Sequence, residues 1–174
     1  MTSALALYDL TRQNLTTADP SNAGFSVQTG EQRSRGLEWE VGADLRGGLK
    51  LTGSYTYTDS RVTRDTNTAL VGSALNLTPR HVATAWATWR VPQWPGVTVG
   101  LGGRYVSEQI GSYPFALPAY AVADASVSYT AGAYRLTLGV KNLTDRRYYD
   151  GAINANVVAP GLPRSATLSG SFFF

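Results

Sequence analysis

The residues of this chain that could do acid–base or nucleophilic chemistry are few. There is one histidine, His81, and no cysteine, so a Ser–His–Asp arrangement could use only His81 and a thiolate metal site is excluded. His81 follows Pro79-Arg80 at the start of a predicted strand, where a structural or solvated role is expected. Glu38 and Glu40 fall on one face of another predicted strand, and we assign them to a polar interior rather than to acid–base catalysis. We therefore predict no catalytic residues, no enzymatic activity, no protein-held metal and no resident cofactor.

The composition narrows the class of protein further. Charged residues make up 16% of the 174 residues, which is below the usual quarter or so, whereas there are 18 Gly, 10 Tyr and 4 Trp. The net charge is +3 and the basic residues are scattered, so a nucleic-acid partner is not indicated. No apolar run of about 18 residues could form a membrane-spanning helix, and no signal peptide opens the chain.

Apolar and polar residues alternate with a period of two, which indicates strands with one apolar face. The clearest runs begin at Leu37, Leu49, Val97 and Tyr134. We predict about eight strands of the length, about 10 residues, that a tilted membrane strand needs. They are expected near 3–14, 25–46, 48–62, 80–92, 95–108, 119–131, 133–143 and 164–174, the second being too long for one bilayer crossing.

Short and long connections alternate along the chain. Tight turns are expected at 45–48, 93–96 and 131–133, and the long polar stretches are 15–24, 63–79, 107–118 and 144–163. Outer-membrane barrels have this arrangement, with short periplasmic turns and long outer loops. The predicted fold is therefore all-β, an antiparallel up-and-down meander of about eight transmembrane β-strands, with both termini on the periplasmic side.

Aromatic residues fall near the ends of the predicted strands. Tyr and Trp favour the membrane interface, where one edge of the ring is wet and the other dry, although aromatics are also common in strands of any kind. These residues are Tyr55, Tyr57, Trp89, Tyr105, Tyr120, Tyr129, Tyr134 and Phe174.

Several motifs resemble a known family. The segment GVKNLTDRRYYDG (139–151), followed by a loop and PGLPRSATLSGSFFF (160–174), is similar to the C-terminus of TonB-dependent outer-membrane receptors. The segments YDLTRQN (8–14), QTGEQRSRGLEWE (28–40) and LTPRHVATAW (77–86) resemble the siderophore branch, especially receptors for hydroxamate siderophores such as ferrichrome. GSYTYTDS (53–60) belongs to the same set.

The resemblance implies the architecture of the whole receptor. Members have a 22-stranded barrel filled by an N-terminal plug domain, with a TonB box near the N-terminus. Residues 1–174 are then expected to be the C-terminal part of the barrel domain, without plug, TonB box or signal peptide. The implied location is the outer membrane of a Gram-negative bacterium.

The resemblance also implies a function and partners. The implied function is TonB-dependent uptake of a ferric siderophore, in which the siderophore and not the protein carries the iron. Implied partners are the ferric siderophore, the TonB–ExbB–ExbD system through the missing N-terminal region, the barrel-assembly machinery, membrane lipid and lipopolysaccharide.

Ligand-binding residues are expected in the outer loops. Aromatic side chains offer a compact chelate stacking area at low entropic cost, and arginines can steer an anionic complex. The alternative is that the tyrosines anchor the loops to the interface or to one another. The candidates are Tyr113, Phe115, Tyr120, Arg146, Arg147, Tyr148 and Tyr149.

The closing strand carries a second expectation. Leu168, Phe172 and Phe174 resemble the C-terminal signal recognised by the barrel-assembly machinery, with Gly170 as a weak position, and plain strand packing is the alternative. Eight strands can close a barrel, but strands shaped for a wider one should leave open edges near 3–14 and 164–174. The other proteins considered are a stand-alone small barrel with a structural or adhesive role, a lipocalin-like barrel and an outer-membrane hydrolase.

Overall fold

The computed structural model describes all residues, 1–174, and is built almost entirely of β-strands. Eight strands form one sheet, and four short strands form two hairpins beside it. No helix in the structure is long and apolar enough to cross a membrane. The strands of the sheet are β1 (Thr2–Ala18), β2 (Ser26–Asp44), β3 (Leu49–Arg64), β4 (His81–Arg90), β5 (Val97–Val106), β8 (Tyr120–Ala131), β9 (Tyr134–Lys141) and β12 (Ser165–Phe172).

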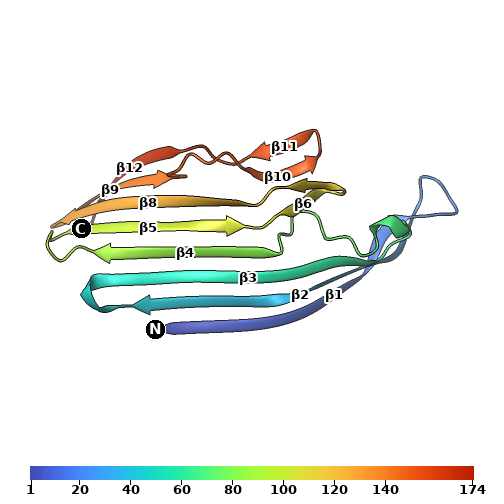
Figure 1. The fold of residues 1–174 in the computed structure, drawn as a ribbon, viewed down its shortest axis with the longest axis horizontal. Coiled ribbons are helices and arrows are strands. Elements are labelled where there is room, and N and C mark those ends of the chain that lie inside the picture. The colour runs from blue at the N-terminus through green and yellow to red at the C-terminus, as the bar shows by residue number, and fades with distance from the viewer.

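The eight strands pair in chain order, each antiparallel to its neighbours, in the sequence β1-β2-β3-β4-β5-β8-β9-β12 (Figure 1). The predicted up-and-down meander is confirmed. The first and last strands do not pair with each other, so the sheet has two free edges, as expected for strands shaped for a wider barrel. Backbone groups at such edges are costly in hydrocarbon, so a membrane-embedded form needs further strands against β1 and β12.

The two ends of the sheet differ. Both chain termini and the short turns lie at one end, and the long connections lie at the other (Figure 1). The β2–β3 turn is a 3₁₀ segment, η1 (Arg46–Gly48), in which Gly47 and Gly48 have φ of 75° and 80°. Glycine meets this left-handed requirement without strain. The predicted alternation of short and long connections is confirmed.

The long connections are more ordered than the sequence predicts. Two of them contain hairpins, β6 (Gln109–Ser112) with β7 (Phe115–Leu117) and β10 (Tyr149–Asn154) with β11 (Val157–Pro160). Strands of three to six residues are too short for alternation to be evident. A third connection contains a short 3₁₀ segment, η2 (Thr68–Leu70).

The predicted end of the first strand is wrong. β1 continues to Ala18 instead of ending near residue 14. The pairing of β1 with β2 shifts register between Arg12 and Leu15, where Asn14 has φ of 58°. A bulge reverses which residues face each side, so the alternation in the sequence breaks there although the strand does not.

The register aligns the apolar residues of successive strands on one face. Leu7 pairs with Leu37, which pairs with Tyr57, and Val99 pairs with Val127, which pairs with Leu138. The same face continues through Leu168 on β12. Of the predicted interfacial aromatics, only Tyr120 faces the other way.

This apolar face has no second layer packed on it. Only 12 of the 174 residues are buried. No part of the protein covers the row of side chains formed by Leu7, Leu37 and Tyr57, and Leu7 is 77% exposed. Soluble monomers rarely expose apolar patches beyond a few hundred Å², so this face is suited to lipid. A sandwich or lipocalin would enclose it instead.

Candidate ligand-binding site

The polar face of the sheet carries a tryptophan seated on two glycines. Trp86 of β4 lies over Gly100 and Gly102 of β5, and a Cβ on Gly100 would come within 2.7 Å of the indole Cζ2. The indole Nε1 donates to Thr88 Oγ1 at 3.0 Å. The glycines thus permit a large aromatic ring to lie flat on the face opposite lipid.

Next to Trp86, a charged and aromatic cluster joins the sheet to the last outer loop. Tyr120 is 5% exposed, and its hydroxyl donates to Asp150 Oδ1 at 2.8 Å. Arg104 Nη2 lies 3.3 Å from the same oxygen, and its guanidinium lies over the Tyr120 ring at 5.4 Å. The Tyr148 ring packs on Tyr120 with centroids 4.4 Å apart. Asp150 therefore ties β10 to the wall formed by β5 and β8.

A second ion pair borders this cluster. Lys141 Nζ lies 2.7 Å from Asp124 Oδ2, and the other carboxylate oxygen accepts the backbone N–H of Asn142 at 2.9 Å. A pocket of about 450 Å³ lies between the two groups, within the range of small-molecule sites. Its lining includes Trp86, Arg104, Asp124, Lys141, Tyr148 and Leu162.

The motif after β9 forms a turn. Asn142 is 3% exposed and has φ of 49°. Its side-chain Nδ2 donates to the carbonyls of Arg146 and Leu162 at 2.9 and 3.0 Å. Its Oδ1 accepts the Arg146 N–H at 2.8 Å. Asp145, with φ of 52°, accepts the Arg164 N–H at 3.0 Å. These two side chains hold the start of the last loop against its end.

The predicted ligand-binding residues fall into three positions. Tyr120 and Tyr148 are in contact at the pocket, although Tyr120 is largely enclosed. Tyr113 and Phe115 lie on the β6–β7 hairpin, which packs beside β10. The others lie in the last loop, where their side chains are exposed: Arg146, Arg147 and Tyr149.

The sequence assigned no role to four residues of this site. Asp150 links the cluster, Asp124 pairs with Lys141, and Leu162 and Trp86 line the pocket. A signal for Trp86 was present, since it falls on the polar parity of β4 and pairs with Gly102. Asp150 and Leu162 carry no such signal, because loop packing brings them to the wall.

The closing strand has the predicted arrangement. Phe172 packs against Tyr134 and Phe174 with tilted rings, the centroids being 4.9 and 6.2 Å apart, and Leu168 shares their face. Phe173, which interrupts the alternation, lies on the other face with the Arg135 guanidinium 5.5 Å over its ring. Recognition of this strand by an assembly machinery stays a prediction.

A one-layered antiparallel sheet with one lipid-facing and one polar face is the wall of an outer-membrane β-barrel. The family described as TonB dependent receptor-like, beta-barrel, matches residues 2–143. The chain belongs to this family, whose barrels lie in the outer membrane.

Curated relatives and a solved structure agree with this assignment. The chain is 40% identical over 172 residues to the metal-pseudopaline receptor CntO of Pseudomonas aeruginosa, covering 95% of this chain and 24% of that protein. It is 37% identical over 179 residues to the ferrichrome outer membrane transporter/phage receptor of Escherichia coli K12, covering 97% of this chain and 24% of the relative. The siderophore receptor PiuA from Acinetobacter baumannii superposes with a TM-score of 0.86 at 26% identity, over 98% of this chain and 26% of that one. The chain thus spans about a quarter of the length of these proteins.

Proposed function

We propose that this chain forms the C-terminal part of the barrel of a receptor that imports a ferric siderophore. The observation that carries the proposal is the pocket on the polar face at the loop end of the sheet. Trp86 and Tyr148 supply aromatic surface there, and the ion pairs Arg104–Asp150 and Lys141–Asp124 supply polar contacts. A compact metal chelate with an amphipathic rim matches both features, and the ligand carries its own metal.

The remaining partners follow from the same proposal. Energy comes from the TonB–ExbB–ExbD system acting on a plug domain and TonB box in the rest of the receptor. The barrel-assembly machinery inserts the strands, with Leu168, Phe172 and Phe174 as its signal. A stand-alone barrel with a structural or adhesive role is not favoured, because β1 and β12 remain unpaired.

A second candidate ligand class comes from the similarity to another receptor. The metal-pseudopaline receptor is 40% identical to this chain, and the ferrichrome transporter is 37% identical. These values do not separate a hydroxamate siderophore from a metal–pseudopaline complex. The two ligands therefore enter the same assay as competing candidates.

The test is growth and metal uptake by cells with and without the full-length gene. Cells starved of iron receive one ferric siderophore at a time, ferrichrome first, and a parallel culture starved of metal receives the metal–pseudopaline complex. Gene-dependent uptake of a ferric hydroxamate is the expected result. Uptake of the pseudopaline complex alone would assign the second ligand class, and no gene-dependent uptake of any chelate would refute the proposal.

Variants connect the uptake to the pocket. Trp86→Ala and Tyr148→Ala are each expected to raise the apparent KM several-fold, because each removes stacking area from the ligand. Tyr129→Ala is the matched control, since Tyr129 faces lipid at the opposite end of the sheet. Equal effects of all three changes would indicate general loss of the barrel rather than loss of a ligand contact.

A further inference from the structure

The two cations of the ligand pocket are each paired with a carboxylate. Arg104 Nη2 lies 3.3 Å from Asp150 Oδ1, and Lys141 Nζ lies 2.7 Å from Asp124 Oδ2. No further charged side chain lines the pocket. The positive and negative charges at the pocket therefore cancel, so the pocket offers an incoming ligand polar contacts without a net charge.

Both carboxylates also accept hydrogen bonds from uncharged groups. Asp150 Oδ1 accepts the Tyr120 hydroxyl at 2.8 Å, and Tyr120 is only 5% exposed. Asp124 Oδ1 accepts the Asn142 backbone N–H at 2.9 Å. Moving either carboxylate away would leave an enclosed donor without its partner, which costs more than the loss of an average hydrogen bond. A ligand that displaces Asp150 or Asp124 therefore loses affinity.

The two cations keep donors that a ligand can use. A guanidinium or an ammonium group has more N–H donors than one carboxylate oxygen accepts. The side chains of Arg104 and Lys141 are also accessible, with 41% and 67% of their surface exposed. Both can donate to the carbonyl oxygens of an uncharged ligand while they stay paired. A free carboxylate on the ligand would instead come close to Asp150 or Asp124 and be repelled by it.

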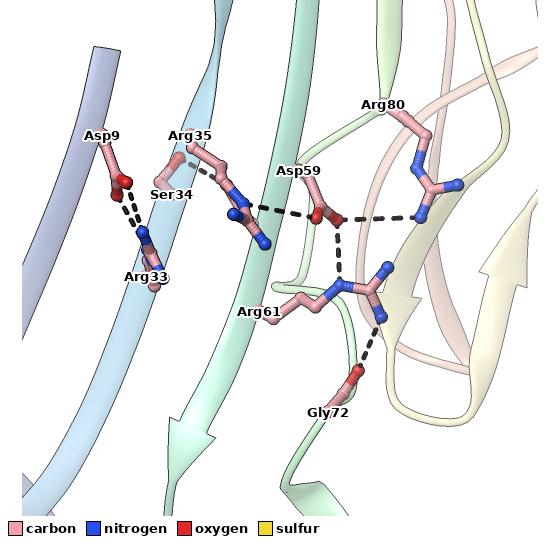
Figure 2. Close-up of polar contacts among 9 residues, drawn as sticks. Asp9, Arg33, Ser34, Arg35, Asp59, Arg61, Gly72 and Arg80 are labelled. Atoms are coloured by element: carbon pink, nitrogen blue, oxygen red, sulfur yellow. Dashed lines mark hydrogen bonds and ion pairs between the residues drawn. The ribbon is translucent and has the colours of Figure 1, made fainter.

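Other arginines at the loop end of the sheet lie on the opposite face. Asp59 shares the face of Tyr57 on β3, which is the apolar face. It pairs with three arginines, as Figure 2 shows: Arg61 at 2.9 Å, Arg80 at 3.8 Å and Arg35 at 4.0 Å. Asp59 is thus a carboxylate with arginine partners that does not face the ligand pocket.

We propose that Asp150 and Asp124 make the pocket selective for chelates without a net negative charge. The inference rests on the proposed uptake of a ferric siderophore and adds the charge that this siderophore must have. A ferric hydroxamate meets the condition, since its hydroxamate anions balance the charge of the ferric ion. A chelate with a free carboxylate must either approach Asp150 or displace it from Tyr120 and Arg104, and both reduce its affinity.

The test compares two ferric chelates that differ only in charge. They are synthetic ferrichromes in which one glycine of the peptide ring is replaced by asparagine or by aspartate, so that both have the same size. Their dissociation constants are measured on the full-length gene product in detergent. The unaltered protein should bind the asparagine analogue about tenfold more tightly, which is close to the effect of one charged hydrogen bond.

Variants assign this preference to the carboxylates. Asp150→Asn keeps an oxygen that can accept from Tyr120 and Arg104 but removes the charge, so it should lower the preference several-fold, and adding Asp124→Asn should remove the rest. Asp150→Glu keeps the charge and should keep most of the preference. Asp59→Asn is the matched control, because it removes the same charge beside arginines on the opposite face, and its preference should equal that of the unaltered protein.

The outcomes separate this inference from the proposed function. Equal affinity of the unaltered protein for both analogues, or a preference that Asp150→Asn does not change, would overturn the charge selection and leave siderophore uptake intact. An effect of Asp59→Asn as large as that of Asp150→Asn would also overturn it, since the overall charge and not the pocket would then set the preference. Binding of neither analogue would exclude a ferric hydroxamate as the ligand and would refute the inference together with that function.

Discussion

Replacing Asn142 by alanine should open the last outer loop, residues 142–164. Asn142 is 3% exposed and makes three hydrogen bonds, at 2.8, 2.9 and 3.0 Å. Each loss leaves a backbone group without its partner, at about 1 kcal/mol each. Alanine at a φ of 49° adds about 1 kcal/mol. The sum, about 4 kcal/mol, raises the population of the open loop roughly a thousandfold.

Hydrogen exchange of the Arg146 amide in the full-length gene product measures this opening. The Arg146 N–H is bonded to Asn142 Oδ1, so its protection should fall by up to about three orders of magnitude in Asn142→Ala. Asn142→Gly separates the loss of the hydrogen bonds from the cost of the left-handed backbone. Glycine removes the same three hydrogen bonds as alanine but adopts a positive φ without strain. Asn142→Asp keeps the acceptor for Arg146 and should retain part of the protection.

Asn154→Ala is the matched control for this loop. Asn154 Oδ1 accepts the N–H groups of Asn156 and Val157 at the tip of the β10–β11 hairpin, at 2.9 and 3.0 Å. The loss of exchange protection caused by Asn154→Ala should be confined to the hairpin. Unchanged exchange at Arg146 in Asn142→Ala would refute the assignment of Asn142 as the residue that closes the loop.

Three other predictions concern the sheet and its edge. Gly100→Val places a branched side chain under the Trp86 indole and should destabilise the barrel by about 1–3 kcal/mol in urea unfolding. Adding Trp86→Ala should recover most of this loss; no recovery would show that a neighbour other than the indole ring, such as the Ser126 side chain, requires glycine at this position. Phe174→Ser should lower the yield of heat-modifiable, folded barrel several-fold in the outer membrane, and an unchanged yield would contradict the predicted assembly signal. The pKa of Asp19 is held below its ordinary value by hydrogen bonds, first from the Asn22 side chain and then from the Ser21 N–H. The β1–β2 loop therefore gains stability above about pH 4 and loses it as the pH falls through the lowered pKa. Faster exchange of the Ser21 amide on acidification, after correction for intrinsic rates, would verify this, and a flat profile would count against it.

The strands could be predicted from the sequence because lipid imposes a strong rule on them. Every second residue between Val97 and Tyr105 must suit hydrocarbon, and none of the intervening residues needs to. The prediction was wrong where that rule stops acting. β1 continues past the bulge at Asn14, and the β6–β7 and β10–β11 hairpins lie where loop packs on loop instead of on lipid. Leu117, which is fully buried, is the centre of that separate packing.

The site was predictable only in part, for a related reason. Tyr120 and Tyr148 were candidates from residue type alone, and the structure places their rings in contact. Asp150, which joins Tyr120 to Arg104, lies 30 residues beyond Tyr120 in a loop. The distance between such residues depends on how the last loop folds back, and no local pattern encodes it.

The motif that carries the family resemblance has a structural role in this chain. Asn142 and Asp145 use left-handed backbone and hydrogen bonds from side chain to backbone to connect the end of β9 with the start of β12. Their side chains are already occupied by backbone groups, which leaves them little capacity to bind a ligand. Residues that define the family are then poor guides to the ligand, and differences in specificity should come from the side chains that this turn holds in place, Tyr148 and Asp150 first.

Parity along each strand separates the two faces of the sheet. On β3 and β4, odd-numbered residues such as Asp59 and Ala85 face lipid, and even-numbered residues such as Trp86 face the polar side. Neighbouring residues in the sequence therefore act in different surroundings, one on the chelate and one on the membrane. It follows that Ala87→Asp, on the lipid face, should lower the yield of inserted barrel without changing the apparent KM for the chelate, and that Trp86→Ala should do the reverse. If both changes affected both measurements equally, the sheet would not separate a lumen from a lipid face, and the assignment of the pocket to the lumen could not stand on the register.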